Sequence, residues 1–235
     1  MKHLINLFLF LVPFVAITAQ KQLDRGYVKM EITDVTSDDP QMAMSLEMMK
    51  GSITEIYFTK EKYKTSMNMM GGMIQMVNHV DIASKKMDML FSAMGNKMWV
   101  DTNTDEAEGS TPGSQNMEDF NVEYDREQTK DILGYKTFKA TINMPNAEGT
   151  RVEGWVTKEI KTDANIIQGM SNLKLEGFPL EFSIVSPQMK LTFTATDIKD
   201  TVEDNEFVLN TDGYKKMTMK EFSESMGGMG AGFGF

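Results

Sequence analysis

The sequence contains no cysteine, and its only histidines are His3 and His79. The absence of cysteine excludes a disulfide framework and thiol catalysis. It also leaves no thiol that could carry a lipid anchor. A chain without these supports must be held together by a hydrophobic core.

Recognisable catalytic motifs are also lacking. The sequence has no H-E-x-x-H metal motif, no G-x-S-x-G nucleophile elbow, no phosphate-binding P-loop and no dinucleotide fingerprint. Carboxylates are abundant, but their number alone does not place a pair of them in a cleft. We therefore expect that the protein is not an enzyme and that it needs no cofactor.

Positive charge is scarce. The chain has 24 Lys and Arg against 34 Asp and Glu, which gives a formal net charge of −10. An acidic surface repels phosphate backbones, so nucleic acid is excluded as a partner. The same repulsion argues against docking on anionic lipid by charge alone.

Only the N-terminus has a long hydrophobic run. Lys2 precedes the apolar segment Leu4–Val15, and Ala19 offers a small residue before a cleavage site. The run is too short to span a membrane and is interrupted by Pro13. We therefore expect residues 1–19 to be a signal peptide and the mature protein to begin near Gln20. That protein is expected to be periplasmic or extracellular and not membrane-spanning.

Most of the remaining chain alternates between apolar and polar residues, which is typical of strands with one buried face. In the central stretch Ile53–Asp101, short turn-rich breaks separate such runs and therefore predict an antiparallel meander. Alternation also predicts strands over Gly26–Thr33, over Met42–Met48 and in a hairpin over Phe178–Ile198. The expected fold is mostly β, with one strongly curved antiparallel sheet of roughly ten strands, a half-barrel, and few short helices.

Polar and glycine-rich stretches set the expected domain organisation. We predict one β-rich domain over residues 20–222 with an exposed acidic loop at residues 102–119. The spacing of isoleucines in Lys158–Leu173 is compatible with one or two short helical turns. Residues 223–235 are rich in glycine and are expected to form a disordered tail.

Methionine is unusually frequent, with 23 residues. Its side chain is flexible and polarizable, so a surface lined by methionine can accommodate ligands of irregular shape. Alternation places several of these side chains where they could share one concave face. The candidate ligand-binding residues are Met67, Met69, Met87, Met89, Phe91 and Met98. The alternative is that the same residues simply fill the core of the sheet.

Two other functions compete with hydrophobic ligand binding. One is a structural or interaction module of the cell envelope that has a protein partner and no small ligand. The other is copper binding, because thioether sulfur suits Cu(I). Its candidate ligands would be His79 and the spaced methionines of Met42–Met44, Met67–Met69 and Met70–Met76. Alternating methionines also arise from strand patterning, so the spacing alone does not assign a metal site.

Short motifs along most of the chain resemble an exported bacterial family known as domain of unknown function 4412. The motifs are Tyr57–Lys60, Met69–Met73, Lys86–Met87, Lys97–Val100, Leu133–Lys136, Trp155–Ile160, Gly177–Leu180 and Gly213–Met217. That family is in turn similar to lipoprotein carriers of the LolA/LolB type. The resemblance implies an incomplete β-barrel whose concave face is covered by helices and holds acyl chains, although this sequence predicts few helices.

Overall fold

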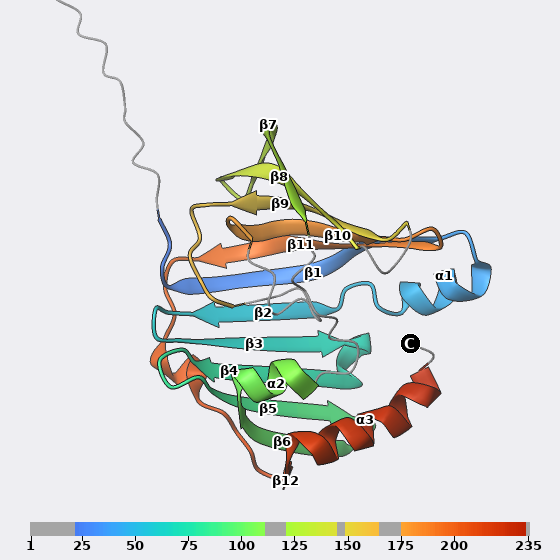
Figure 1. Ribbon diagram of the computed structural model, residues 1–235, viewed down its shortest axis with the longest axis vertical. Coiled ribbons are helices and arrows are strands. Elements are labelled where there is room, and N and C mark those ends of the chain that lie inside the picture. Colours follow the sequence, from blue (N-terminus) through green and yellow to red (C-terminus); the bar gives the residue numbers. More distant parts are fainter. Residues whose placement is uncertain (1–21, 111–120, 145–148, 165–174, 234–235) are drawn as a thin grey trace, which may run out of the picture.

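The computed structural model describes residues 22–110, 121–144, 149–164 and 175–233, and within them one twelve-stranded sheet dominates (Figure 1). Its strands are β1 (Gly26–Ser37), β2 (Ile53–Phe58), β3 (Lys62–Met69), β4 (Ile74–Asp81), β5 (Lys86–Ala93), β6 (Asn96–Asn103), β7 (Val122–Ile132), β8 (Tyr135–Asn143), β9 (Arg151–Thr157), β10 (Phe178–Val185), β11 (Met189–Lys199) and β12 (Lys215–Met217). The helices are α1 (Pro40–Glu47), α2 (Thr104–Ser110) and α3 (Met219–Phe233), with the 3-10 turns η1 (Met70–Gly72) and η3 (Asp204–Phe207). The prediction of a mostly β fold with one large curved sheet and few helices is confirmed.

The strand order is β12-β6-β5-β4-β3-β2-β1-β11-β10-β9-β8-β7. Strands β1 to β6 form one antiparallel meander, and β7 to β11 form a second one. The pairing of β1 with β11 joins the two meanders, and β12 adds a short parallel strand beside β6. The central meander expected over residues 53–101 therefore forms, as one half of a larger sheet.

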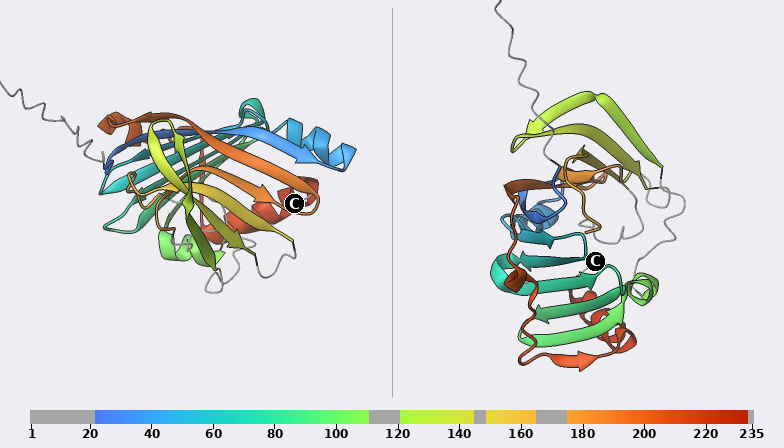
Figure 2. Two further views of the ribbon diagram at one scale, coloured as in Figure 1. Left: turned by 90° about the horizontal axis from the view of Figure 1, so that it is seen from above. Right: turned by 90° about the vertical axis from the view of Figure 1, so that its left-hand side faces the viewer.

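The seam between the meanders runs from the Tyr27–Lys199 pair to the Ser37–Met189 pair. Its register shifts between Lys29 and Met30 and again between Ile32 and Asp34. Irregularities of this kind bend a strand and increase its twist. The seam is therefore a place where the sheet can curve, and Figure 2 shows the whole sheet curled into an open half-barrel.

We call the side of the sheet that carries Met30, Met67 and Phe91 the inner face, and the opposite side the outer face. Directly paired residues point to the same side of a sheet, so the register identifies the members of each face. On the inner face, one buried cluster includes Val28, Ile56 and Phe182 around the seam. A second buried cluster lies over β5 and β6 and includes Phe91 and Met98.

Helix α1 corrects the strand predicted over Met42–Met48. The Asp39 side chain accepts hydrogen bonds from the backbone N–H groups of Gln41 at 2.7 Å and Met42 at 3.2 Å. Pro40, in the first turn, already has a backbone angle that suits a helix. This N-terminal cap outweighs the alternating pattern, and only Leu46 of the helix is buried.

Helices α2 and α3 form where a loop and a disordered tail were predicted. The Asn103 side chain accepts a hydrogen bond from the Glu106 backbone N–H at 2.8 Å and so caps α2. At α3, the Thr218 hydroxyl accepts from the Glu221 backbone N–H at 3.2 Å, and the Glu221 carboxylate accepts from the Thr218 backbone N–H at 2.8 Å. This reciprocal capping box starts the helix. The predicted loop over residues 102–119 thus begins as the end of β6 and α2, and its residues 111–119 lie outside the described ranges.

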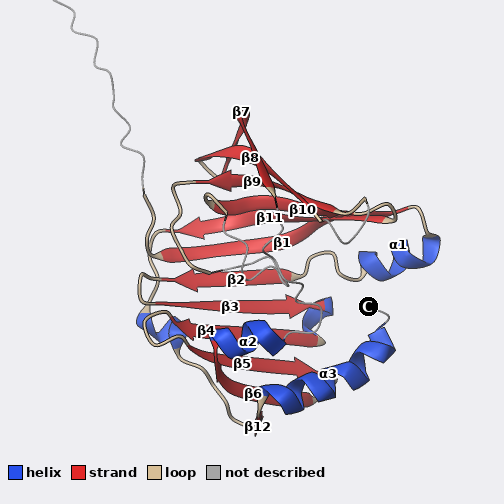
Figure 3. Cartoon of the chain, viewed as in Figure 1, coloured by secondary structure: helices blue, strands red, loops and turns tan. Residues whose placement is uncertain are grey.

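Both helices cover the inner face of β4 to β6 (Figures 1 and 3). Buried Ala107 of α2 and buried Met219 and Phe222 of α3 belong to the second cluster. Of the helices in the described ranges, none has the length and apolar character needed to cross a bilayer.

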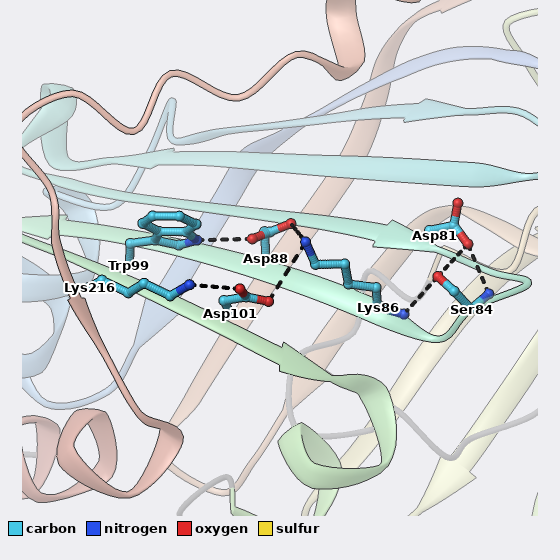
Figure 4. A network of polar contacts seen from close by, with 7 residues as sticks. All are labelled: Asp81, Ser84, Lys86, Asp88, Trp99, Asp101 and Lys216. Atoms are coloured by element: carbon cyan, nitrogen blue, oxygen red, sulfur yellow. Dashed lines mark hydrogen bonds and ion pairs between the residues drawn. The ribbon is translucent and has the colours of Figure 1, made fainter.

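The outer face is polar near β12, where a network of charged side chains attaches this strand to the sheet (Figure 4). Lys216 Nζ lies 2.8 Å from an Asp101 carboxylate oxygen and lowers the pKa of that carboxyl group. Lys86 Nζ lies 3.8 Å from both Asp88 and Asp101. The Trp99 indole N–H donates to Asp88 at 2.9 Å. Together these contacts support an edge strand of only three residues.

Residues 200–214 connect β11 to β12 across the outer face and form a strap. The Arg25 guanidinium donates to the Val202 carbonyl at 2.9 Å, and the Lys64 ammonium donates to the Glu206 carbonyl. Val202 and Phe207 of the strap are buried. The strap therefore shields part of the outer face as well as joining two distant strands.

His79 lies beneath this strap, with its ring centroid 6.3 Å from that of Phe207. Burial lowers the pKa of His79, nearby Asp88 opposes the shift, and Lys62 and Lys64 reinforce it. A lowered folded-state pKa means that the folded protein favours the neutral ring more than the unfolded chain does. This contribution to stability is present above the unfolded pKa of about 6.5 and is lost as the pH falls through the folded value.

We therefore expect the urea midpoint to decrease when the pH is lowered from about 7.5 to about 5.5, a window above the ordinary carboxylate pKa values. The variant His79→Leu should lose most of this decrease, because it has no proton to bind at that position. An equal decrease in the variant and the parent protein would assign the pH dependence to other groups.

Candidate functional site

The six predicted binding residues lie on one face of the sheet. The register aligns an inner-face row across six neighbouring strands, consisting of Met30, Thr54, Met67, Met76, Phe91 and Met98. Met69 is two residues from Met67 on the same strand, and Met87 and Met89 precede Phe91 at the same spacing. Alternation therefore places all six candidates on the inner face, as the sequence indicated.

The structure nevertheless divides these six residues into two groups. Phe91 and Met98 are buried in the second cluster, and Met87 and Met89 pack against it. The Phe91 ring meets the Phe222 ring of α3 edge-on, with centroids 5.9 Å apart. These four residues contribute to packing under α2 and α3, whereas Met67 and Met69 are half-buried on a part of the face outside this cluster.

Met67 and Met69 line a cavity of about 160 Å³ that lies over the seam between the meanders. The other described lining residues are Met30, Ile32, Met49, Ser52, Thr54, Phe182, Ile184, Leu191 and Phe193. Phe182 and Phe193 stack with ring centroids 4.5 Å apart and an interplanar angle of 11°. The cavity is therefore an apolar site with two stacked aromatic rings on one wall.

Several of these lining residues were missing from the predicted site. The alternating pattern did assign Ile32, Phe182, Ile184, Leu191 and Phe193 to apolar strand faces. It could not reveal that β1 pairs with β11, which brings those faces beside Met67. Met49 follows α1, in a region where the sequence predicted a strand. Because that prediction was wrong, the place of Met49 beside the cavity could not be predicted.

Two buried polar side-chain atoms have no hydrogen-bond partner in the part of the chain that the structure describes. They are Asn78 Oδ1 and His79 Nε2, on adjacent residues of β4. Asn78 lies on the inner face, directly between Thr65 and Met89. A buried acceptor without a partner is unfavourable, so a donor that reached Asn78 Oδ1 would satisfy it.

His79 points to the opposite face from Met67 and Met76, because neighbouring residues on a strand alternate. Met42 and Met44 lie in α1. The candidate copper ligands are thus divided between two faces and a helix. Within the described ranges no three His, Asp or Glu side chains group as a metal site either.

A larger cavity, of about 410 Å³, lies beside β7 to β9. It is lined by Gln22, Arg126, Thr129, Lys136, Thr137, Phe138, Lys158 and Glu159. Arg126 and Lys158 already contact the Glu176 carboxylate at 2.5 Å and 3.2 Å, and the hydrogen bond from Arg126 is the main cause that lowers the pKa of Glu176. The cationic side chains that line the larger cavity are exposed, and Glu176 partly neutralises them. The smaller apolar cavity is therefore the stronger candidate site.

No family model and no curated protein matches this chain. The resemblance to the family of unknown function therefore stays a prediction. Among solved structures, the lipoprotein LppX of Mycobacterium tuberculosis is similar with 13% identity and a TM-score of 0.36, over 78% of this chain and 91% of LppX. An uncharacterised protein of Thermus thermophilus aligns with 8% identity and a TM-score of 0.44, over 85% of this chain and 93% of its own. LprF of Mycobacterium bovis aligns with 12% identity and a TM-score of 0.31, over 79% of this chain and 90% of its own.

The cover formed by α3 can be tested with Phe222→Ala. Truncating a buried phenylalanine usually lowers stability by about 3–5 kcal/mol. A terminal helix can undock instead of leaving a cavity, so we expect a loss of about 3 kcal/mol or less, measured by urea denaturation. Binding of an apolar dye should increase, because Phe91 and Met98 become exposed. Unchanged dye binding together with unchanged stability would show that α3 does not protect this face.

Proposed function

We propose that this chain is an exported, non-catalytic binding protein that holds a hydrophobic or lipidic ligand on the open part of its inner face. The observation that carries this proposal is the apolar cavity over the seam, lined by Met67 and Met69 from one meander and by Phe182 and Phe193 from the other. Binding sites for small molecules are mostly apolar and concave, with few polar groups. The cavity has that character.

The volume of the cavity limits what it can hold as it stands. At about 160 Å³ it is smaller than the roughly 300–1,000 Å³ of common ligand pockets. Apolar cavities near 150 Å³ are known to hold a molecule of benzene size. A whole acyl chain would therefore need the half-exposed methionines to move, and the three rotatable bonds of methionine allow this. The cavity favours one short apolar segment at its centre with adaptable walls around it.

Asn78 is a candidate polar contact beside the proposed cavity, whose own described lining includes the polar residues Ser52 and Thr54. Its unpartnered Oδ1 lies on the same face as Met67, one strand away. A ligand with a hydroxyl or amide N–H could donate to this oxygen, which would orient the ligand on an otherwise apolar surface. A simple hydrocarbon could not satisfy it.

An envelope interaction module without a small ligand is the second candidate function. The cover that α2 and α3 place over Met87, Met89, Phe91 and Met98 favours it, because four of the six predicted site residues contribute to the core. The two functions differ in what they require of Met67 and Met69. Only ligand binding needs the space beside these side chains.

Uptake of an environment-sensitive fatty-acid probe tests the proposal. We expect the folded protein to bind the probe with modest affinity and little dependence on chain length, because methionine specifies shape weakly. The variant Ile184→Trp should reduce uptake strongly, since the added ring occupies the cavity that Ile184 lines. The matched control is Val77→Trp, a half-buried position on the outer face of β4.

Circular dichroism and urea denaturation should establish that both tryptophan variants are folded. Equal uptake by Ile184→Trp and the parent protein would place the probe outside the cavity. No uptake by the folded parent protein would favour the interaction module.

Asn78→Leu separates ligand binding from stability. Removing a buried acceptor without a partner should leave the free energy of unfolding unchanged or raise it by about 1–2 kcal/mol. If the amide oxygen accepts from the ligand, the variant should bind a probe that carries a hydroxyl or amide less tightly. Binding of a probe without such a donor should not weaken. A marked loss of stability would instead mean that the asparagine is needed by the fold.

A further inference from the structure

One end of the sheet exposes methionine side chains to an unusual extent. We call Met44, Met48, Met73 and Met94 the methionine rim; their exposed fractions are 74%, 56%, 53% and 68%. In the described ranges only Leu133 and Val208 are other large apolar side chains that are comparably exposed. The rim comes from α1 and its end, from the turn between β3 and β4, and from the turn between β5 and β6. These connections lie at the same end of the sheet, on the right in Figure 1.

The turns of this rim are not ones that favour methionine. Met70 and Met94 have backbone φ angles of 53° and 50°, in the left-handed region. Glycine and asparagine adopt this region readily, whereas other L-residues are disfavoured there. Turns are also usually polar. Backbone preference therefore does not account for Met70 and Met94, and solubility does not account for the exposed side chains of Met73 and Met94. A function of the exposed surface is the better explanation.

The same end of the sheet is depleted in charge. Residues 69–73, 93–96 and 185–189, which connect β3 to β4, β5 to β6 and β10 to β11, contain no charged side chain in a chain with a net charge of −10. Charges occur nearby around α1, where Asp39 caps the helix and Glu47 pairs with Lys50 at 3.3 Å, and at Lys97, Arg151 and Lys190, which lie near the start of β6, β9 and β11. At the opposite end, the turns carry Lys60, paired with Asp24 at 2.6 Å, and Lys85, paired with Asp105 at 3.0 Å.

The rim also borders the apolar cavity. Met49 and Met69 line the cavity. Met49 directly follows the rim residue Met48, and Met69 precedes the turn that carries the rim residue Met73. Ser52, which directly precedes β2 at this end, lines the cavity as well. An apolar surface next to an apolar cavity would let a ligand pass between them with little contact with water.

We propose that the methionine rim rests on the surface of a zwitterionic lipid bilayer, so that a ligand can pass between the bilayer and the cavity. The passage of ligand depends on the proposed binding function, whereas the docking itself does not. A lipid surface fits better than a protein partner, because the three uncharged turns offer no charged group that would orient a protein. The strongly acidic chain would be repelled by anionic lipid, which favours zwitterionic headgroups.

Vesicle flotation of the purified secreted protein tests the proposal. The parent protein and every variant should begin at the same N-terminal residue. We expect the parent protein to float with phosphatidylcholine vesicles, and to float less when part of this lipid is replaced by phosphatidylglycerol. The triple variant Met44→Asp, Met73→Asp and Met94→Asp should reduce the vesicle-bound fraction by about tenfold, because interfacial binding scales with buried apolar area. Aspartate tolerates the left-handed conformation at position 94, so this change is compatible with folding.

Leu133→Asp is the matched control. Leu133 is 50% exposed and has a φ of 51°, but its turn between β7 and β8 lies at the opposite end of the sheet. This control should float like the parent protein. Equal loss in the control and in the rim variant would overturn the assignment of the rim, as would undiminished flotation of the rim variant. Failure of the parent protein to float on phosphatidylcholine, or a requirement for anionic lipid, would overturn the choice of a zwitterionic bilayer and leave a protein as the partner of this surface.

Fatty-acid probe uptake without vesicles separates this proposal from the proposed binding function. Uptake by the rim variant should match that of the parent protein, because the substituted residues lie outside the cavity lining. Flotation without any probe uptake would support the docking surface and reject the cavity as a ligand site. Probe uptake without flotation would do the reverse.

Discussion

The pairing of β1 with β11 is the constraint on which the rest of this structure depends. Each meander is built from local hairpins, but the seam joins residues that are distant in sequence, such as Tyr27 and Lys199. Hydroxyl groups contribute across it, since Thr33 Oγ1 and Thr194 Oγ1 lie 2.8 Å apart. Without the seam, the inner faces of the two meanders would not meet, and the cavity would have no second wall. Such non-local pairing forms slowly because the chain must close a long loop first.

The inner face shows how one apolar surface can contain both a packed core and a candidate site. Beneath α2 and α3, aromatic and methionine side chains are buried, and packing there stabilises the fold. Over the seam, the structure describes no helix on that face, and the same kinds of side chain border a cavity. The N-terminal caps of α2 and α3 therefore influence indirectly which methionines are covered. Composition alone does not distinguish the two groups.

Alternation in the sequence predicted much of this arrangement, because strand periodicity is a local property that follows from backbone geometry. It identified the central meander, the β10–β11 hairpin and a common face for Met67, Phe91 and Met98. It failed where another local signal competed. The spacing of Met42, Met44 and Met48 imitates a strand, but Asp39 and Pro40 begin a helix there. The glycine-rich C-terminus predicted a disordered tail, although the Thr218–Glu221 capping box starts a helix there. The second wall of the cavity depends on a tertiary pairing that no local pattern encodes.

Polarity in this molecule is sorted along two independent directions. Alternation along each strand separates the apolar inner face from an outer face that carries networks such as Lys86, Asp88 and Asp101. Turn composition also differs between the two ends, since turns at one end carry Lys60 and Lys85 in ion pairs and the uncharged β3–β4 and β5–β6 turns at the other end carry exposed methionines. The first separation is required for any sheet with a buried face. The second is not required by folding, because a turn can be polar without disturbing the strands beside it. The composition of one end therefore needs an explanation other than folding, which the separation of the two faces does not.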